Sequence, residues 1–333
     1  MLDRRPPRPE HDLWRYQDVI VEDERTADGR IARSATVFLT GRECPWRCVM
    51  CDLWRYTTGA DTPPGAIAAQ VAAARTRWQR EQLPVTHVKL YNAASFFDPR
   101  AVPESDYGRV ASAIAGVAQV VVESHPALIG PRVDQFLEAR EICRAAAAPL
   151  GPGVQTGPPT RLEVAMGLET VHPSALERLH KRMTVEQFAV AAAALRARGV
   201  SLRVFLLIAP PFIPPDEQEA WLLRSVDVAL DCGASAVTLI PTRAGNGAME
   251  ALSAEGAFRP PTLEDIERSA EAAQARIRDR ERIFVDIWDL ERFSDCSACF
   301  AARRDRLHAM NLEQRILPPI ACEQVQAVSA GKK

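Results

Sequence analysis

Three cysteines within residues 44–51 are the residues of this sequence with the most distinctive chemistry. Cys44, Cys48 and Cys51 have the spacing C-x3-C-x2-C. They follow an apolar, β-branched stretch, residues 35–39, that is typical of a strand. Thiolates are the usual ligands of 4Fe–4S clusters, so this loop can bind three irons. No fourth cysteine is near in the sequence, which leaves one iron open to a ligand that the protein does not supply.

Other chemistries of cysteine fit this loop less well. Structural zinc sites more typically use two C-x2-C pairs or a mixture of cysteine and histidine. A disulfide framework is typical of small secreted chains, whereas this sequence has 333 residues, eight cysteines and no apolar secretory signal at its start. Cys143 and Cys232 lie in helical stretches and have the pattern of ordinary buried thiols. The spacing therefore predicts an iron–sulfur loop.

A second group of cysteines lies near the end of the sequence. Cys296 and Cys299 form a C-x2-C pair, and Cys322 follows. A pair with a distant third cysteine is typical of part of a metal site, either structural zinc or a second 4Fe–4S cluster. The fourth ligand could be His308, Asp295 or a group that is not protein. The alternative is three free thiols in a helix-rich tail.

The elements that must position these loops alternate between strands and helices. The expected strands are apolar and bounded by turn residues: 35–39, 87–91, 120–123, 162–167, 202–208 and 236–240. The expected helices between them are rich in alanine: 66–81, 107–117, 133–148, 185–198 and 217–232. Gly199 and Gly233 stand where a glycine commonly ends a helix. Six β/α repeats predict an α/β fold with a parallel sheet.

Polar residues follow these strands at their carboxyl ends, where ligands gather in β/α barrels. Buried parallel strands are mostly apolar, so polar strand ends indicate a role in binding. The candidates are Asn92, Ser95, Glu123, His125, Glu169 and Arg243. Arg203 starts a strand, at the opposite end, and is expected to be structural. The basic residues His180, Lys181 and Arg182 have the pattern of a solvated helix end.

With its cysteine spacing and a nearby aromatic residue, the chain resembles the radical S-adenosylmethionine (SAM) superfamily. One branch is more similar: the radical SAM subunit of archaeosine synthase and, more loosely, the radical SAM domain of the Elongator catalytic subunit. The resemblance runs from about Val37 to Leu252. It rests on five phrases, Tyr-Asn-Ala-Ala-Ser-Phe-Phe-Asp at 91–98, Val-Val-Glu-Ser-His-Pro at 121–126, Gly-Leu-Glu-Thr at 167–170, Ala-Pro-Pro-Phe at 209–212 and Ile-Pro-Thr at 240–242.

The resemblance implies a partial (β/α)6 TIM-like barrel over residues 31–255. An N-terminal extension (1–30) would precede it, and a C-terminal cysteine-bearing extension (256–333) would follow it. It also implies a 4Fe–4S cluster whose open iron binds the amino and carboxylate groups of SAM. Candidate SAM contacts are Asn92 or Ser95 for the amino group, Glu123, Glu169 for the ribose, and Arg243 for a carboxylate or phosphate. Pocket walls would come from Phe38, Trp46, Trp54, Tyr56 and Phe96.

The reaction implied by this resemblance is reductive cleavage of SAM to a 5′-deoxyadenosyl radical, which takes a hydrogen atom from a substrate. An electron donor such as ferredoxin or flavodoxin is expected. The substrate would be a modified nucleoside or tRNA, or a small molecule from a biosynthetic pathway. A non-catalytic iron–sulfur or zinc protein that binds nucleic acid is an alternative, as is an electron carrier. The polar strand ends argue against both alternatives.

Composition agrees with an enzyme of the cytoplasm. Hydrophobic residues make up 47% of the sequence and charged residues 25%, which is enough apolar material for a core. The formal net charge of −2 gives no overall basic signature for nucleic acid, although a single basic groove would be compatible with it. No apolar run has the length of a membrane span, so no membrane partner is expected.

Overall fold

The computed structural model describes residues 5–146 and 160–321, and its framework is one curled sheet. The strands follow one another across the sheet in chain order. The first strand is antiparallel to the second, and all later neighbours are parallel. The strands are β1 (Asp18–Arg25), β2 (Ile31–Phe38), β3 (His87–Tyr91), β4 (Gln119–Glu123), β5 (Arg161–Glu169), β6 (Ser201–Ile208), β7 (Ala234–Pro241) and β8 (Arg282–Val285).

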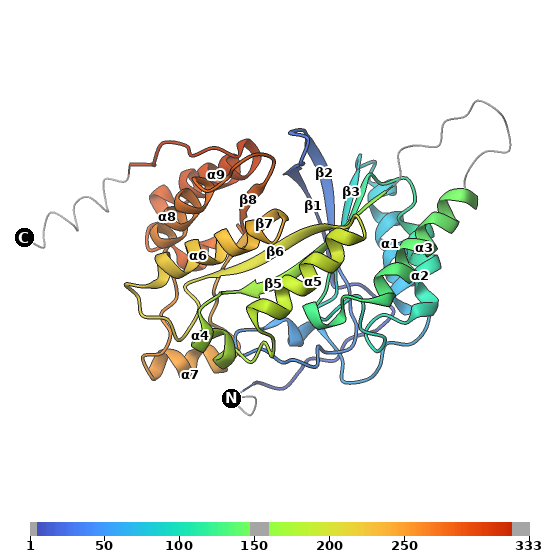
Figure 1. The fold of residues 1–333 in the computed structure, drawn as a ribbon, viewed down its shortest axis with the longest axis horizontal. Helices are drawn as coiled ribbons and strands as arrows, with labels where there is room; N and C mark the ends of the chain where they lie inside the picture. The colour runs from blue at the N-terminus through green and yellow to red at the C-terminus, as the bar shows by residue number, and fades with distance from the viewer. Residues whose placement is uncertain (1–4, 147–159, 322–333) are drawn as a thin grey trace, which may run out of the picture.

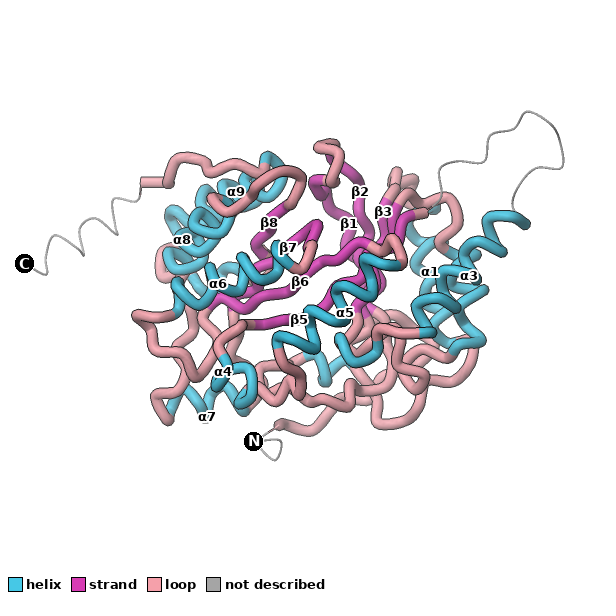
Figure 2. Tube along the Cα trace, in the orientation of Figure 1, coloured by secondary structure: helices cyan, strands magenta, loops and turns pink. Residues whose placement is uncertain are grey.

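Helices cover the outer face of this curled sheet (Figure 1), and long loops gather beyond the carboxyl ends of the strands (Figure 2). The α-helices are α1 (Ala66–Arg80), α2 (Tyr107–Ala113), α3 (Pro131–Ala146), α4 (Pro173–Arg178), α5 (Val185–Ala197), α6 (Gln218–Asp231), α7 (Ala248–Ala254), α8 (Leu263–Gln274) and α9 (Ser297–Glu313). Short 3₁₀ turns are η2 (Leu53–Tyr56), η3 (Glu104–Asp106), η4 (Pro126–Leu128) and η5 (Leu290–Phe293). The predicted α/β partial barrel is therefore confirmed.

The six expected strands correspond to β2–β7, and the five expected helices to α1, α2, α3, α5 and α6. Strand β1 was not predicted, because five of its eight residues are charged and it lacks the apolar run of a central strand. It lies within the predicted N-terminal extension, while β8, α8 and α9 lie within the predicted C-terminal extension. Both extensions thus add strands to the same sheet as the barrel. The three-part division remains a prediction.

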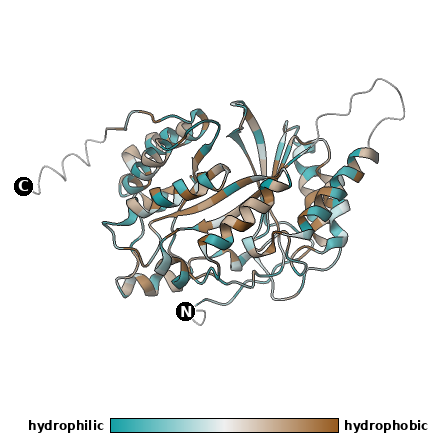
Figure 3. Cartoon of the chain, in the orientation of Figure 1, coloured by the Kyte–Doolittle hydropathy of each residue, from teal (hydrophilic) through white to brown (hydrophobic). Residues whose placement is uncertain are grey.

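The apolar core lies between the sheet and its helices. Val88 and Leu90 of β3 and Val120 and Val122 of β4 are fully buried, at every second position. Helix α1 packs its buried residues, Trp78 among them, against this outer face. In Figure 3 the apolar colouring is strongest on the central strands, whereas the helices carry both apolar and polar colours. This packing fixes the positions of the strand ends that carry the site.

The inner face of the sheet carries polar and aromatic side chains instead. Lys89 and Tyr91 alternate with the outward residues of β3. The Tyr91 ring lies edge-on to Phe38 at 6.5 Å and to Phe205 at 6.1 Å between ring centroids. Aromatic rings therefore separate the two ends of the barrel interior: ionic groups at the amino ends of the strands, and the cysteine loop at the carboxyl ends.

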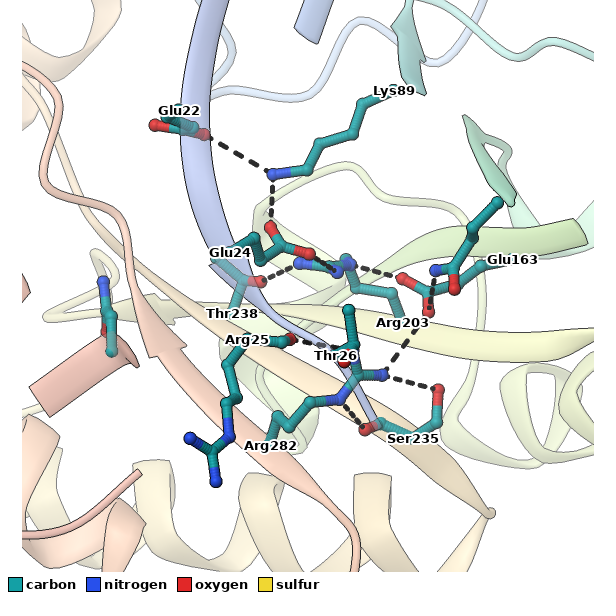
Figure 4. Close-up of polar contacts among 12 residues, drawn as sticks. Glu22, Glu24, Arg25, Thr26, Lys89, Glu163, Arg203, Ser235, Thr238 and Arg282 are labelled. Atoms are coloured by element: carbon teal, nitrogen blue, oxygen red, sulfur yellow. Dashed lines mark hydrogen bonds and ion pairs between the residues drawn. The ribbon is translucent and has the colours of Figure 1, made fainter. Parts of the chain in front are cut away.

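A network of buried ion pairs fills the amino end (Figure 4). Arg203 contacts Glu24 at 2.7 Å and Glu163 at 2.6 Å, and its side chain is only 2% exposed. Lys89 also pairs with Glu24, and Arg282 lies 3.5 Å from Glu163. Glu24 belongs to the edge strand β1, so the network ties this edge to the centre of the sheet. The prediction that Arg203 is structural is confirmed.

The charges of this network hold each other ionised. Burial would raise the pKa of Glu24, but Arg203 and Lys89 lower it to well below its ordinary value. Burial likewise opposes ionisation of Glu163, yet Arg203 and Arg282 lower its pKa. Burial would lower the pKa of Arg203, and the two carboxylates raise it instead. The network is thus ionic at neutral pH.

None of the helices in the described ranges is both long enough and apolar enough to span a membrane.

Candidate functional site

The cysteine loop begins just after β2, at the carboxyl edge of the sheet. Cys48 is buried, whereas Cys44 and Cys51 are partly exposed. Burial raises the pKa of Cys48 to about 11 and also raises the pKa values of Cys44 and Cys51. The other thiols of the loop add to the upward shifts of the pKa values of Cys48 and Cys51. Such thiols become thiolates most readily when bound to a cation.

Neighbouring loops hold the cysteine loop through its backbone. The Val49 N–H donates to the Leu179 carbonyl at 3.0 Å, and the Cys48 thiol lies 4.0 Å from the His180 carbonyl. Asn246 donates from Nδ2 to the carbonyls of Val49, at 2.8 Å, and Cys51, at 3.2 Å. The same amide caps α7 through its oxygen, which accepts from two backbone N–H groups. No local sequence pattern indicates this anchoring role.

An N-terminal segment crosses the loop from outside. Arg5 Nη1 donates to Glu43 Oε1 at 2.9 Å, and Arg8 also pairs with this carboxylate. The Arg5 guanidinium lies 5.1 Å from the centre of the Trp54 ring and 3.5 Å from the Cys48 carbonyl. Glu43 is itself buried, so its charge requires these cations. The segment covers the loop and limits its contact with water.

An aromatic stack joins the loop to β4. The Trp46 ring lies over the His125 ring at a centroid distance of 3.8 Å and an interplanar angle of 13°. His125 Nδ1 accepts from the Ala127 N–H, so Nε2 carries the proton and donates to the Lys181 carbonyl at 2.9 Å. Burial lowers the pKa of His125 to about 4, which keeps the ring neutral. His125 therefore positions the loop.

The predicted polar strand ends of β3 and β4 meet beside this stack. The Asn92 side chain is fully buried, and neither of its polar atoms has a hydrogen-bond partner among the described residues. Burial raises the pKa of Glu123 to about 8, although the Asn92 backbone N–H favours the ionised carboxylate. The Ser95 hydroxyl accepts from the His125 N–H at 2.9 Å. Asn92 and Glu123 thus offer hydrogen-bonding groups at the carboxyl edge.

At the end of β5, Glu169 pairs with Lys181, with 2.6 Å between Oε1 and Nζ. Both side chains are largely buried, at 8% and 12% exposure. The prediction of a solvated helix end is therefore wrong for Lys181, although His180 and Arg182 are exposed. A carboxylate twelve positions earlier in the chain turns the lysine inward, and local sequence carries no sign of that pairing.

Arg243, after β7, is only partly exposed. Its Nη2 donates to Asp286 Oδ2 and to the Trp288 carbonyl, both at 2.7 Å. Its Nε is buried and has no partner among the described residues. One side of the guanidinium thus remains available for a further acceptor, and its role toward a carboxylate or phosphate remains a prediction.

The predicted pocket walls divide between two places. Trp46 and Trp54 belong to the cysteine loop region, and Phe38 faces the barrel interior. Phe96 was wrongly predicted as a wall. It is fully buried and packs against Tyr107 and Phe136 under the helices, because the chain turns outward after β3. Tyr56 is 47% exposed.

The C-terminal cysteine pair lies at the start of α9. Cys296 and Cys299 are both buried, and Arg303 donates to the Cys299 sulfur. Cys322 lies outside the described residues, and Asp295 is exposed. His308 stands nine positions after Cys299 in α9, about 13 Å along the helix axis, so it cannot share one ion with both cysteines. The suggestion of His308 as the fourth ligand is wrong.

The cysteine loop suits a cluster better than a single ion. Within residues 5–146 and 160–321, no three His, Cys, Asp or Glu side chains converge closely enough to hold one metal ion. In an iron–sulfur cluster each thiolate binds its own iron, so the sulfurs need not converge on one point. The unpartnered Asn92 amide at the same edge of the sheet fits a polar ligand beside such a cluster.

Comparison with known proteins confirms the resemblance predicted from the sequence. No protein-family model matches the chain. The chain is 25% identical over 262 residues to archaeosine synthase subunit beta of Methanosarcina acetivorans, covering 75% of this chain and 70% of the relative. It is 23% identical over 264 residues to an uncharacterised protein of Methanocaldococcus jannaschii, covering 74% of this chain and 66% of the relative, slightly less than two thirds of its length.

The fold is also similar to a solved structure. Archaeal Elp3 from Methanocaldococcus infernus, with an N-terminal deletion, matches with a TM-score of 0.52 at 13% identity. The match covers 74% of this chain and 59% of that one. This likeness supports the partial-barrel fold.

Proposed function

We propose that this protein is a radical SAM enzyme. The observation that carries the proposal is the cysteine loop: three neighbouring buried or half-buried thiols at the carboxyl edge of a half barrel. Similarity to archaeosine synthase subunit beta over three quarters of the chain supports it. Cys44, Cys48 and Cys51 would hold a 4Fe–4S cluster with one iron open to SAM.

The residues around the loop would bind and orient SAM. The Asn92 amide and the Glu123 carboxyl, which is mainly protonated at neutral pH, offer donors and acceptors to the amino acid end or the ribose. Ser95, Glu169 and Arg243 are further candidates at the same edge. When bound, the reduced cluster and SAM together supply a 5′-deoxyadenosyl radical. The Trp46–His125 stack and the N-terminal segment would exclude water from this region.

Anaerobic reconstitution with iron and sulfide tests the activity directly. The protein should become brown and, with a reductant and SAM, should release 5′-deoxyadenosine and methionine. A ferredoxin or flavodoxin should replace the chemical reductant. A colourless protein that binds only zinc would contradict the proposal. A brown protein that leaves SAM intact would favour an electron carrier or a non-catalytic binding protein.

For the substrate we propose a modified nucleoside, carried in tRNA. The relatives that support this are archaeosine synthase subunit beta and Elp3. Two exposed arginines near the cysteine loop, Arg47 and Arg178, are placed to contact phosphates.

Binding to bulk tRNA should therefore be measurable at low ionic strength and should weaken steeply as salt is added, because phosphate contacts release counterions. Filter binding or fluorescence anisotropy over a salt series measures this. Absence of binding even at low salt would contradict the RNA substrate and leave a small molecule.

We also propose that Cys296, Cys299 and Cys322 share a metal, zinc or a second 4Fe–4S cluster. Two buried thiols spaced C-x2-C at the start of α9 support this. Replacing all three with alanine should remove one metal site while the iron bound by the first loop is retained. Metal analysis by mass spectrometry measures this, and a metal content equal to that of the wild type would show that they are free thiols.

A further inference from the structure

The turn that follows α4, residues 179–182, contacts the cysteine loop and its stacking partner through three successive backbone carbonyls. Its first carbonyl accepts from Val49 N–H, and its second lies 4.0 Å from the Cys48 thiol. Its third, from Lys181, accepts from His125, whose ring is stacked on Trp46 between the cysteines. The backbone of this turn therefore has little freedom to move relative to the loop.

The tight turn brings the Lys181 ammonium into the interior. His180 and Arg182 both adopt positive φ, at 57° and 54°, so the chain reverses on each side of the lysine. Lys181 then extends over β5, where an added Cβ at Gly167 would stand 2.5 Å from its Nζ and 2.2 Å from Glu169 Oε1. Only a glycine leaves room for this ion pair.

Glu169 reaches the lysine from a strained position. Its φ is +67°, and the pairing of β5 with β6 shifts register between Gly167 and Glu169. Backbone strain of this kind costs free energy and persists where the surroundings require it. Here the strain places a carboxylate 2.6 Å from a buried ammonium. A buried lysine would otherwise lose its proton, and Glu169 keeps it charged.

The ion pair lies beside the cysteine loop, because Lys181 directly follows His180, whose carbonyl lies 4.0 Å from the Cys48 thiol. The Lys181 ammonium lowers the pKa values of both Cys44 and Cys48, partly offsetting their burial. Glu169 raises the pKa of Cys48, and this effect is smaller than the lowering by Lys181. The two charges of the pair therefore act on the Cys48 sulfur with opposite signs, and each can be removed separately.

We propose that Lys181 is a positioning residue that raises the reduction potential of the cluster at Cys44, Cys48 and Cys51, and that Glu169 limits the rise. This inference rests on the proposed function, because it requires a cluster on that loop. Accepting an electron adds a negative charge, which a nearby fixed cation stabilises. Removing the cation should make reduction harder, whereas removing the carboxylate should make it easier.

The opposite signs of these two effects distinguish an electrostatic role from a merely structural one. If Lys181 only held the turn in place, it would do so through its ion pair with Glu169, and loss of either residue would have the same effect. In that case Lys181→Met and Glu169→Gln would both loosen the loop and would change the cluster in the same direction. Lys181→Arg keeps the charge and should keep the wild-type potential. Arg182→Met, next in the chain, removes an exposed charge as a matched control.

The measurement is a potentiometric titration of the reconstituted full-length protein without SAM, followed by the EPR signal of the reduced cluster. Iron is counted in each sample. At a fixed solution potential, Lys181→Met should lower the ratio of reduced to oxidised cluster about tenfold. This corresponds to a reduction potential lower by ~59 mV for one electron. Glu169→Gln should raise this ratio, and Lys181→Arg and Arg182→Met should leave it within about twofold of wild type.

An unchanged potential in Lys181→Met with full iron would overturn the inference, as would shifts of one sign in both variants. If Lys181→Met takes up no iron, the other two variants decide. A ratio of reduced to oxidised cluster in Glu169→Gln that equals or falls below the wild-type ratio would overturn the inference. A ratio in Lys181→Arg below that of the wild type would also overturn it. Failure of the wild-type protein to bind iron at all would instead contradict the proposed function.

Discussion

Replacing Cys44, Cys48 or Cys51 with alanine should abolish cleavage of SAM, down to the level of a protein-free control. Each thiolate of an iron–sulfur cluster binds its own iron, so two remaining cysteines would leave the cluster with two open positions. The iron content of each variant should fall together with release of 5′-deoxyadenosine. Iron analysis and product quantification by liquid chromatography under anaerobic conditions measure both.

Cys232→Ala is the matched control for these variants. Cys232 follows α6, away from the loop, and is also partly buried. This variant should retain its iron and cleave SAM at the wild-type rate. A Cys48→Ala protein with full iron and full activity would show that the loop does not hold the cluster, and the proposed function would fall with it.

Replacing Arg203 with leucine should lower the free energy of unfolding by about 3–5 kcal/mol at pH 7, because removal of one partner leaves buried charges uncompensated. Glu24 and Glu163 both contact this guanidinium, and both would lose their main cation. Urea denaturation followed by circular dichroism measures the change. Arg33→Ala, which breaks the exposed pair with Asp23, should cost at most about 1 kcal/mol.

The deficit of the Arg203→Leu variant should depend on pH with a defined sign. In the wild type the pKa values of Glu24 and Glu163 are lowered, so their contribution to stability is present above about pH 4.5 and is lost as the pH falls. Without Arg203, burial should raise these pKa values above those of the unfolded chain. The difference between variant and wild type should therefore shrink from pH 7 toward pH 4. A difference that is constant over this range would mean that Arg203 acts by packing alone.

The sequence was informative where local pattern and structure agree. The apolar runs of β3 and β6 and the capping box of Thr184 and Gln187 at the start of α5 are local signals, and the structure contains all of them. The three cysteines could be found because their spacing itself suits the chemistry.

Residues whose roles depend on distant partners could not be found in this way. Lys181 has the local pattern of an exposed basic residue, and only the carboxylate of Glu169 turns it inward. Asn246 holds a loop that lies 197 positions earlier in the chain. Five of the eight residues of β1 are charged, and one of them, Glu24, pairs with Arg203 across the barrel interior. A search for alternating apolar residues cannot detect such a pairing.

The ion network at the amino end of the barrel has a consequence for synthesis of the chain. The Arg282 guanidinium donates to the Arg25 carbonyl over a separation of 257 positions, and Glu24 meets Arg203 over 179. A ribosome releases the N-terminal partners long before the last arginine emerges. Until Arg203 and Arg282 have both emerged, Glu163 lacks part of the positive charge that it needs when buried, so water must remain in this end of the nascent barrel. Closure of this end is therefore a late step of folding, and slow as contacts of such high sequence separation generally are.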